Sequence, residues 1–210
     1  MQQILPFILS INCLVFAADI NSVSINLWGI SADGSLMAWQ EDTCDGESMA
    51  IKLVIAGTMD HQVLEVIPIL SVSPDDPGLR LARKKMKALG IVPATYLEIE
   101  QDVYGQYAQL PQSKGEFPHE LRLYLKIDPS LHFYRLEISD LSEDLSSCKA
   151  LSKLLYYNEN QPFKVSLTGV WINSNQDICV AIVEEDYYSD GHQQIDRIYA
   201  ISTWMTIGFD

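Results

Sequence analysis

Two acidic loops contain the residues of this sequence that are best suited to binding a metal ion. Each loop carries carboxylates around an Asp-Gly turn: Asp42, Asp45 and Glu47 in EDTCDGE, and Glu185, Asp186 and Asp190 in EEDYYSDG. Calcium takes six to eight oxygen ligands, which carboxylates around a tight glycine turn can supply. Neither loop has the spacing of an EF-hand, and acidic loops with glycine also serve as solvated connections between strands. The sequence leaves both interpretations open, and calcium is the only cofactor it suggests.

The histidines form no recognisable zinc or catalytic motif. No two of them lie four residues apart: His61, His119, His132 and His192. The pair His119-Glu120 begins like a metalloprotease motif, but Leu123 stands where the second histidine is required. We therefore name no catalytic residue and expect a protein that is not an enzyme. A cysteine and a histidine that meet only in the fold are the alternative left open.

The N-terminal segment is typical of an export signal. No Asp, Glu, Lys or Arg precedes Asp19, and an apolar run extends from Ile4 to Ala18. This run is shorter than the roughly 20 residues that cross a bilayer, and small residues at Ala17 and Ala18 suit cleavage there. The sequence therefore predicts a signal peptide over residues 1–18 and a single domain over 19–210, periplasmic or secreted, with no membrane span after cleavage.

Charge and cysteines constrain the partners and the compartment. The net charge of −14 repels phosphate backbones, so we expect no nucleic-acid partner. Three cysteines remain after cleavage, namely Cys44, Cys148 and Cys179, and no C-x-x-C occurs. An oxidising compartment allows a disulfide, and we expect it between Cys148 and Cys179.

Period-two alternation of apolar residues predicts that most of the chain forms β-strands. The first of these strands is SVSINLWGIS, residues 22–31, and similar patterns recur up to RIYAISTWM, residues 197–205. We expect half-buried strands with one apolar face. The polar segment over 100–120 is predicted to be a long loop.

Residues 73–90 depart from this pattern and predict a helix. Asp76 suits the N-cap, Pro77 the first turn and Gly90 the position after the last turn. The predicted apolar stripe consists of Leu79, Ala82, Met86 and Leu89. Five basic residues lie on this segment, which suggests either a dock for an acidic ligand or partner, or a solvated face that pairs with the protein's own acids. A second helix is predicted over 139–155.

A strand–turn–strand pattern occurs twice. Residues 28–55 and 171–201 each contain a strand, a polar turn, a second strand ending in acids, an Asp-Gly and a third apolar strand. Duplication of a three-strand unit and two unrelated meanders both explain this pattern.

The order of these features resembles a family of secreted bacterial proteins of unknown function. The resemblance rests on the signal peptide, GISADGSLMAWQ with its Ser-x-Asp-Gly hairpin, DGES, and the Ala/Arg/Lys helix ending in KALGI. It covers about the first 90 mature residues well and the last 35 loosely. The resemblance implies export and a shared β-rich fold, and it names no catalytic residue.

Together these features predict a mainly β (α+β) fold, an antiparallel meander or sandwich with one helix packed on the sheet. The expected function is a non-enzymatic binding or envelope-associated module for an unknown protein or small-molecule ligand. The alternative is a periplasmic hydrolase with an unrecognised active site.

Export is testable by intact-mass measurement of the protein recovered from its native host. Because the signal peptide is expected to be removed after Ala17 or Ala18, the mature chain should begin at Ala18 or Asp19. A cytoplasmic chain that still begins at Met1 or Gln2 would contradict the prediction.

Overall fold

A computed structural model describes residues 22–45, 48–71, 73–111, 120–128, 133–140, 151–156, 164–188 and 192–203. The segment assigned to the signal peptide lies outside these ranges, as do Glu47, Cys148 and Asp190. No helix in the ranges described has the length and hydrophobicity needed to cross a membrane.

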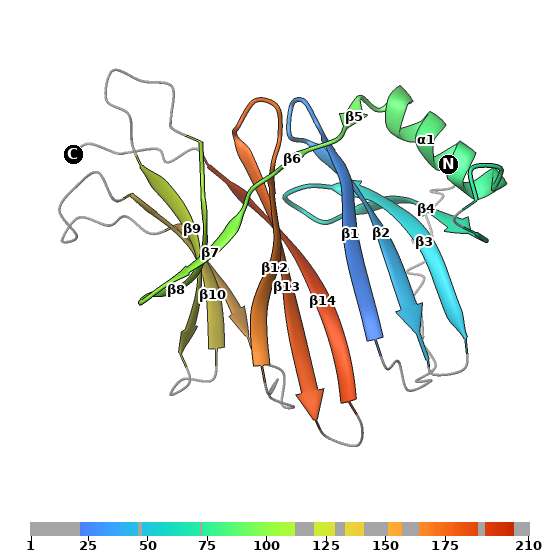
Figure 1. Cartoon of the computed structure of the whole chain (residues 1–210). Coiled ribbons are helices and arrows are strands. Elements are labelled where there is room, and N and C mark those ends of the chain that lie inside the picture. Colours follow the sequence, from blue (N-terminus) through green and yellow to red (C-terminus); the bar gives the residue numbers. More distant parts are fainter. Residues whose placement is uncertain are drawn as a thin grey trace, which may run out of the picture.

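The strands form two sheets (Figure 1). The larger sheet has nine strands in the order β4-β3-β2-β1-β14-β13-β12-β6, with β5 beside β1: β1 (Ser22–Ser31), β2 (Leu36–Cys44), β3 (Met49–Gly57), β4 (Val63–Ile69), β5 (Ile91–Val92), β6 (Thr95–Tyr96), β12 (Lys164–Ile172), β13 (Ile178–Tyr188) and β14 (His192–Ser202). The smaller sheet has the order β11-β10-β9-β8-β7: β7 (Ile99–Asp102), β8 (Gly105–Gln109), β9 (Leu121–Asp128), β10 (Phe133–Asp140) and β11 (Leu151–Tyr156). Every pairing is antiparallel except β1 with β14. The predicted mainly β fold with one packed helix is confirmed.

Three apolar clusters hold these layers together. On one face of the large sheet, Leu53, Ile55, Ile67 and Ile69 pack against the helix α1 (Pro77–Ala88). On its other face, residues of β1–β3 pack with residues of β13 and β14. The third cluster joins the small sheet to β12–β14. Met37, Ala38 and Trp39 are therefore all buried, so this part of β2 is covered on both faces and is not half-buried as predicted.

Helix α1 follows the sequence prediction closely. Leu79, Ala82 and Met86 are buried against the sheet, whereas Leu89 is 39% exposed just beyond the helix. Gly90 has φ +67°, a conformation that glycine adopts without strain. The Asp76 carboxylate accepts from the Leu79 N–H at 2.9 Å and from the N–H groups of Leu70 and Ser71 at 3.1 and 3.0 Å. Asp76 therefore caps the helix and ties its start to the end of β4.

Two predictions for the middle of the chain are wrong. Both ends of the segment 139–155, predicted to be a helix, belong to strands. Residues 133–140 form β10, and residues 151–156 form β11 beside it. Residues 141–150 lie outside the described residues. The loop predicted over 100–120 begins as a hairpin of β7 and β8. In both cases pairing between strands overrides the local pattern.

The two repeated hairpins share a detailed turn geometry. Gly34 and Gln176 occupy the same turn position with φ +70° and +63°. Each turn closes through a side chain that accepts from the backbone of the following strand: Ser31 Oγ from Leu36 N at 2.9 Å, and Asn173 Oδ1 from Ile178 N at 3.0 Å. These correspondences favour duplication of the three-strand unit.

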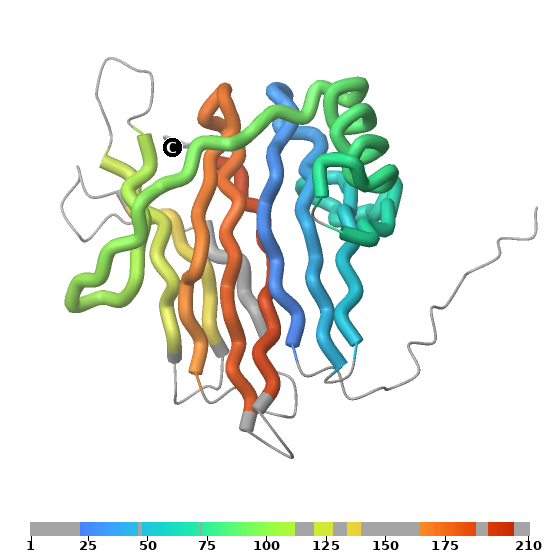
Figure 2. Tube along the Cα trace, turned by 45° about the vertical axis from the view of Figure 1, so that its right-hand side comes forward, coloured from blue at the N-terminus to red at the C-terminus, as the bar shows by residue number. Residues whose placement is uncertain are grey.

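The first strand of each repeat also carries a register shift, three residues before Ser31 in β1 and five residues before Asn173 in β12. The pairing register shifts between Leu27 and Gly29 in β1, and between Leu167 and Gly169 in β12. Beyond the shift each strand gains a two-residue partner, β5 for β1 and β6 for β12. Figure 2 shows how the segment that holds β5 and β6 crosses from α1 over the large sheet to the small sheet.

The Asp76 cap predicts a pH-dependent effect on stability. Its hydrogen bond from the Leu79 N–H and those from Ser71 and Leu70 lower the pKa of Asp76 below the usual 3.8. A lowered pKa contributes stability above the unfolded value that is lost as the pH falls through the folded value. Asp76→Asn should therefore lower Tm by about 2 to 4 °C at pH 7, and less at pH 3. Thermal melts that show the same deficit at both pH values would contradict this role.

Candidate functional site

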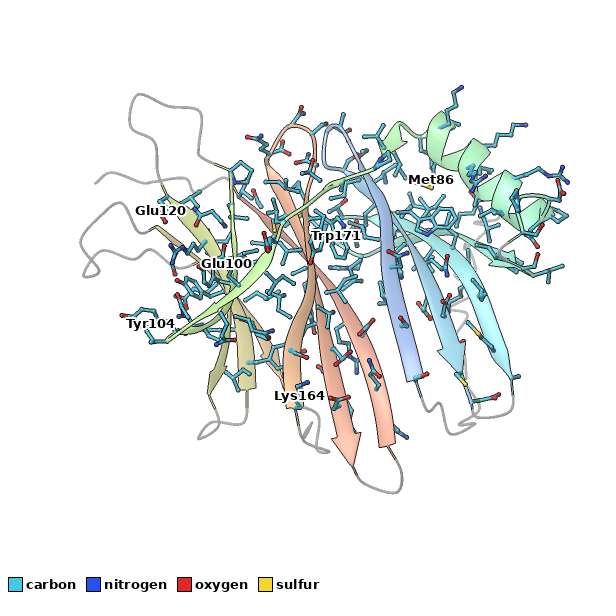
Figure 3. All side chains as sticks on the ribbon, viewed as in Figure 1. Met86, Glu100, Tyr104, Glu120, Lys164 and Trp171 are labelled. Carbon is cyan, nitrogen blue, oxygen red and sulfur yellow. The ribbon has the colours of Figure 1, made fainter. Side chains whose placement is uncertain are left out.

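A shallow pocket of about 450 Å³ lies between α1 and the large sheet. Trp28 on β1 forms one side, and Arg83, Met86 and Lys87 of α1 form another. The rest of the lining comes from the chain that leaves the helix, Gly90 to Pro93. Met86 lies beneath α1, facing the sheet (Figure 3). The pocket therefore combines an indole ring, a thioether and two cations.

Local irregularity in β1 explains how Trp28 reaches this position. Leu27 pairs with Trp39 and Gly29 with Ala38, so Trp28 is the extra residue of a bulge. Bulges redirect side chains, often beside functional sites. A Cβ on Gly29 would lie 2.2 Å from the Val92 carbonyl oxygen, so only glycine lets β5 approach β1 here. The bulge and its glycine thus bring Trp28 and β5 together at the pocket.

The cations of α1 are mostly unpaired within the described residues. Lys85 forms an ion pair with Glu65 at 3.1 Å. The other four basic residues of the helix form no ion pair with any described residue: Arg80, Arg83, Lys84 and Lys87. Arg83 and Lys87 lie one turn apart on the same flank, the flank that lines the pocket. Among the residues that the structure describes, the interpretation that this helix face pairs with the protein's own acids holds for Lys85 alone.

The lining of the pocket suits binding. It contains no His, Cys, Ser, Asp or Glu. Trp28, Met86 and Ile91 offer apolar contact, while Arg83 and Lys87 can donate hydrogen bonds to an anion. Such a pocket matches a ligand that joins an anionic group to an apolar body.

The first group of proposed metal ligands is engaged within its own hairpin. The Asp42 carboxylate accepts from Gln40 Nε2 at 2.8 and 3.0 Å. The Asp45 carboxylate accepts from the N–H and the hydroxyl of Ser48 at 2.7 and 2.8 Å. Both contacts stabilise the end of the β2–β3 hairpin. Glu47 lies outside the described residues.

Glu185 and Asp186 of the second group lie on β13 and not on a loop, because this strand extends to Tyr188. Strands β2 and β13 are three positions apart in the sheet, about 14 Å, so Asp42 on β2 cannot share one ion with Glu185 or Asp186 on β13. Across the described ranges no three His, Cys, Asp or Glu side chains are placed to hold a metal. Asp186 lies on β13 opposite Lys164, and Asp190 lies outside the described residues. Calcium binding by a single loop stays a prediction.

Glu185 belongs to a buried polar network that the sequence did not predict. Only 5% of Glu185 is exposed, and its carboxylate accepts from the hydroxyls of Tyr134 and Tyr187 and from Arg197 Nε, the last two at 2.6 and 3.1 Å. The Tyr134 hydroxyl also lies 3.0 Å from the hydroxyl of Tyr199, within hydrogen-bonding distance. Burial, and next the neighbouring Tyr199 and Glu185, raise the pKa of Tyr134. The network joins β10 of the small sheet to β13 and β14 of the large one.

A second polar cluster covers the outer face of the small sheet. Arg122 lies 4.5 Å from the Tyr107 ring centre, and Lys126 lies 4.0 Å from that of Tyr124. The Tyr107 hydroxyl donates to Glu100 at 2.5 Å, and the Tyr124 hydroxyl donates to Asp102 at 3.0 Å. Charges and rings here contact one another, so the cluster stabilises β7–β9.

The cysteines differ in exposure. Cys179 is fully buried on β13, and burial raises the pKa of its thiol to about 12. Cys44 at the end of β2 is partly exposed, and these two cysteines are not bridged to each other. Because Cys148 lies outside the described residues, its disulfide with Cys179 stays a prediction.

Comparison with protein-family models, with curated proteins and with solved structures finds no match to this chain. The assignment of a function therefore rests on the geometry of the site.

The Glu185 network predicts a large loss of stability on truncation. Glu185→Ala leaves two tyrosine hydroxyls and the Arg197 guanidinium without their acceptor, which should reduce the free energy of unfolding by about 2 to 4 kcal/mol. Urea denaturation measures this change. The control is Glu98→Ala, an exposed carboxylate with no side-chain hydrogen bond or ion pair to a described residue, which should cost less than about 1 kcal/mol. Equal losses for the two variants would contradict the role of Glu185.

Proposed function

We propose that this protein is an exported, non-enzymatic binding module that takes an acidic ligand in the pocket between α1 and Trp28. The observation that carries the proposal is the placement, beside an indole ring in a strongly acidic protein, of cations that form no ion pair with a described residue. Arg83 and Lys87 line the pocket with Trp28, and the chain as a whole carries a charge of −14.

The distribution of charge supports an acidic ligand. Five of the 14 basic residues lie on the 12 residues of α1, and only one of the five pairs with a described acid. At physiological salt, charges act over about 8 Å, so a ligand in the pocket responds mainly to Arg83 and Lys87 and less to distant acids. The surrounding negative surface disfavours anions elsewhere on the protein. An anion is therefore expected to bind most favourably in this pocket.

The apolar lining supports a ligand with more than a bare charge. Trp28, Met86 and Ile91 to Pro93 contribute ring, thioether and aliphatic surface. Burial of apolar area contributes about 25 cal/mol for each Å², whereas exposed ion pairs contribute little. Both parts of the ligand would thus be needed for measurable affinity.

Export is the second part of the proposal. It is supported by the apolar run before Asp19 and by the resemblance of the first mature residues to a family of secreted bacterial proteins. The hydrolase alternative would require a histidine with a carboxylate or thiol in the pocket. The lining contains none of these groups, so we propose binding.

The pocket can be tested with 8-anilinonaphthalene-1-sulfonate, a dye that joins a sulfonate to apolar rings. Its fluorescence should rise on binding, and the affinity should fall with added salt. Arg83→Gln and Lys87→Gln should each raise Kd about 3- to 10-fold, since each removes a cation from the lining. Trp28→Ala should weaken binding further by removing apolar area.

Lys84→Gln is the matched control, because Lys84 belongs to the same helix but does not line the pocket. It changes the net charge by the same amount and should leave Kd within about twofold. Dye binding that is insensitive to Arg83→Gln and Lys87→Gln, or equally sensitive to Lys84→Gln, would overturn the proposal.

A further inference from the structure

Strand β4 ends the nine-stranded sheet on one side and exposes an apolar edge. Val63, Leu64 and Val66 are 53%, 54% and 51% exposed. Met59 and Leu70, just outside the strand, are 56% and 85% exposed. An edge strand also presents unpaired backbone N–H and C=O groups. This edge therefore offers both hydrogen bonds and apolar surface to another strand.

The usual protections against strand addition are weak on β4. Natural edges carry lysines, prolines, bulges or a covering element. On β4 the proline is Pro68, near the end of the strand, and the bulge lies at Leu64 near its start. The one charged residue, Glu65, is already paired with Lys85 at 3.1 Å. The stretch from Glu65 to Ile67 is left without a proline or an uncompensated charge.

We propose that β4 pairs antiparallel with β4 of a second copy of this chain, which joins the two large sheets across a twofold axis. Antiparallel pairing of one strand with itself is self-complementary, so the same surface serves both copies. The proposal is independent of the ligand pocket.

Charge favours a second copy at this edge in particular. A protein of charge −14 repels itself over most of its surface. At β4 the one carboxylate of the strand, Glu65, is neutralised by Lys85. The strand therefore presents no uncompensated acid to a second copy.

Each face of the joined strands would gain apolar contacts. Val63 and Val66 lie on the face opposite α1, since they pair with Ala56 and Val54 of the cluster on that side. On the α1 side, Leu81 is 43% exposed, one turn before Lys85 and on the same flank of the helix. A strand added beside β4 would thus meet Leu81 above and Val66 below.

Sedimentation velocity of the purified protein tests the proposal. Over about 5 to 200 μM the protein should shift from monomer to dimer, as expected for a small interface. Val66→Lys should weaken association at least about tenfold, because it adds a positive charge to each of the two joined strands. Val66→Thr, which keeps the β-branched shape, should leave the dimer intact.

The control for added charge is Val103→Lys, at a 91% exposed site in the turn between β7 and β8. It should leave association unchanged, and thermal melts should show that all variants fold. Amide hydrogen exchange of residues 63–69 should slow as the dimer forms. A chain that stays monomeric at about 200 μM, or a dimer insensitive to Val66→Lys, would overturn the proposal and leave the edge to another occupant.

Discussion

The packing of α1 against one face of the large sheet is the contact on which the candidate site depends. Leu79, Ala82 and Met86 set the rotation of the helix by burying one stripe, and Asp76 sets its start by tying the first turn to the end of β4. With rotation and start determined, Arg83 and Lys87 must lie on the flank that faces Trp28. The positive charge of the pocket is thus a consequence of where the apolar stripe falls on the helix.

The two halves of the large sheet explain why the site occurs once. The units β1–β2–β3 and β12–β13–β14 share the turn geometry of Gly34 and Gln176 and a register shift before a glycine. Only the first unit is followed by β4 and α1, which cover its outer face. The small sheet covers the other face of the second unit, because Cys179 and Ala181, which pack in its cluster, occupy the positions of Met37 and Trp39 on the side away from α1. The two similar units therefore have different covers, and the pocket lies at the cover that carries the cations.

The sequence predicted features that local physics determines, and it missed those that need long-range contacts. Alternation and capping located β1 and the helix from Asp76 to Gly90, because the periodicity and the turn residues act within a few positions. Residues 151–156 were misassigned because their strand exists by pairing with β10. The position of Trp28 depends on a bulge and on β5, more than 60 residues further along the chain. The sequence placed Glu185 in an acidic loop, because its partners Tyr134 and Arg197 lie on other strands and cannot be found from local pattern.

The central claim is that an acidic ligand binds between α1 and Trp28. Titration of ¹⁵N-labelled protein with 8-anilinonaphthalene-1-sulfonate, followed through the indole N–H signals, tests it most directly. Trp28 is half-buried in the pocket, whereas Trp39 is only 7% exposed and packs on the opposite face of the sheet. We predict that the Trp28 indole signal and the amides of residues 83–93 shift together while the Trp39 signal stays in place. Shifts that gather on the small sheet or around Asp42 and Asp45, with Trp28 unmoved, would contradict the claim.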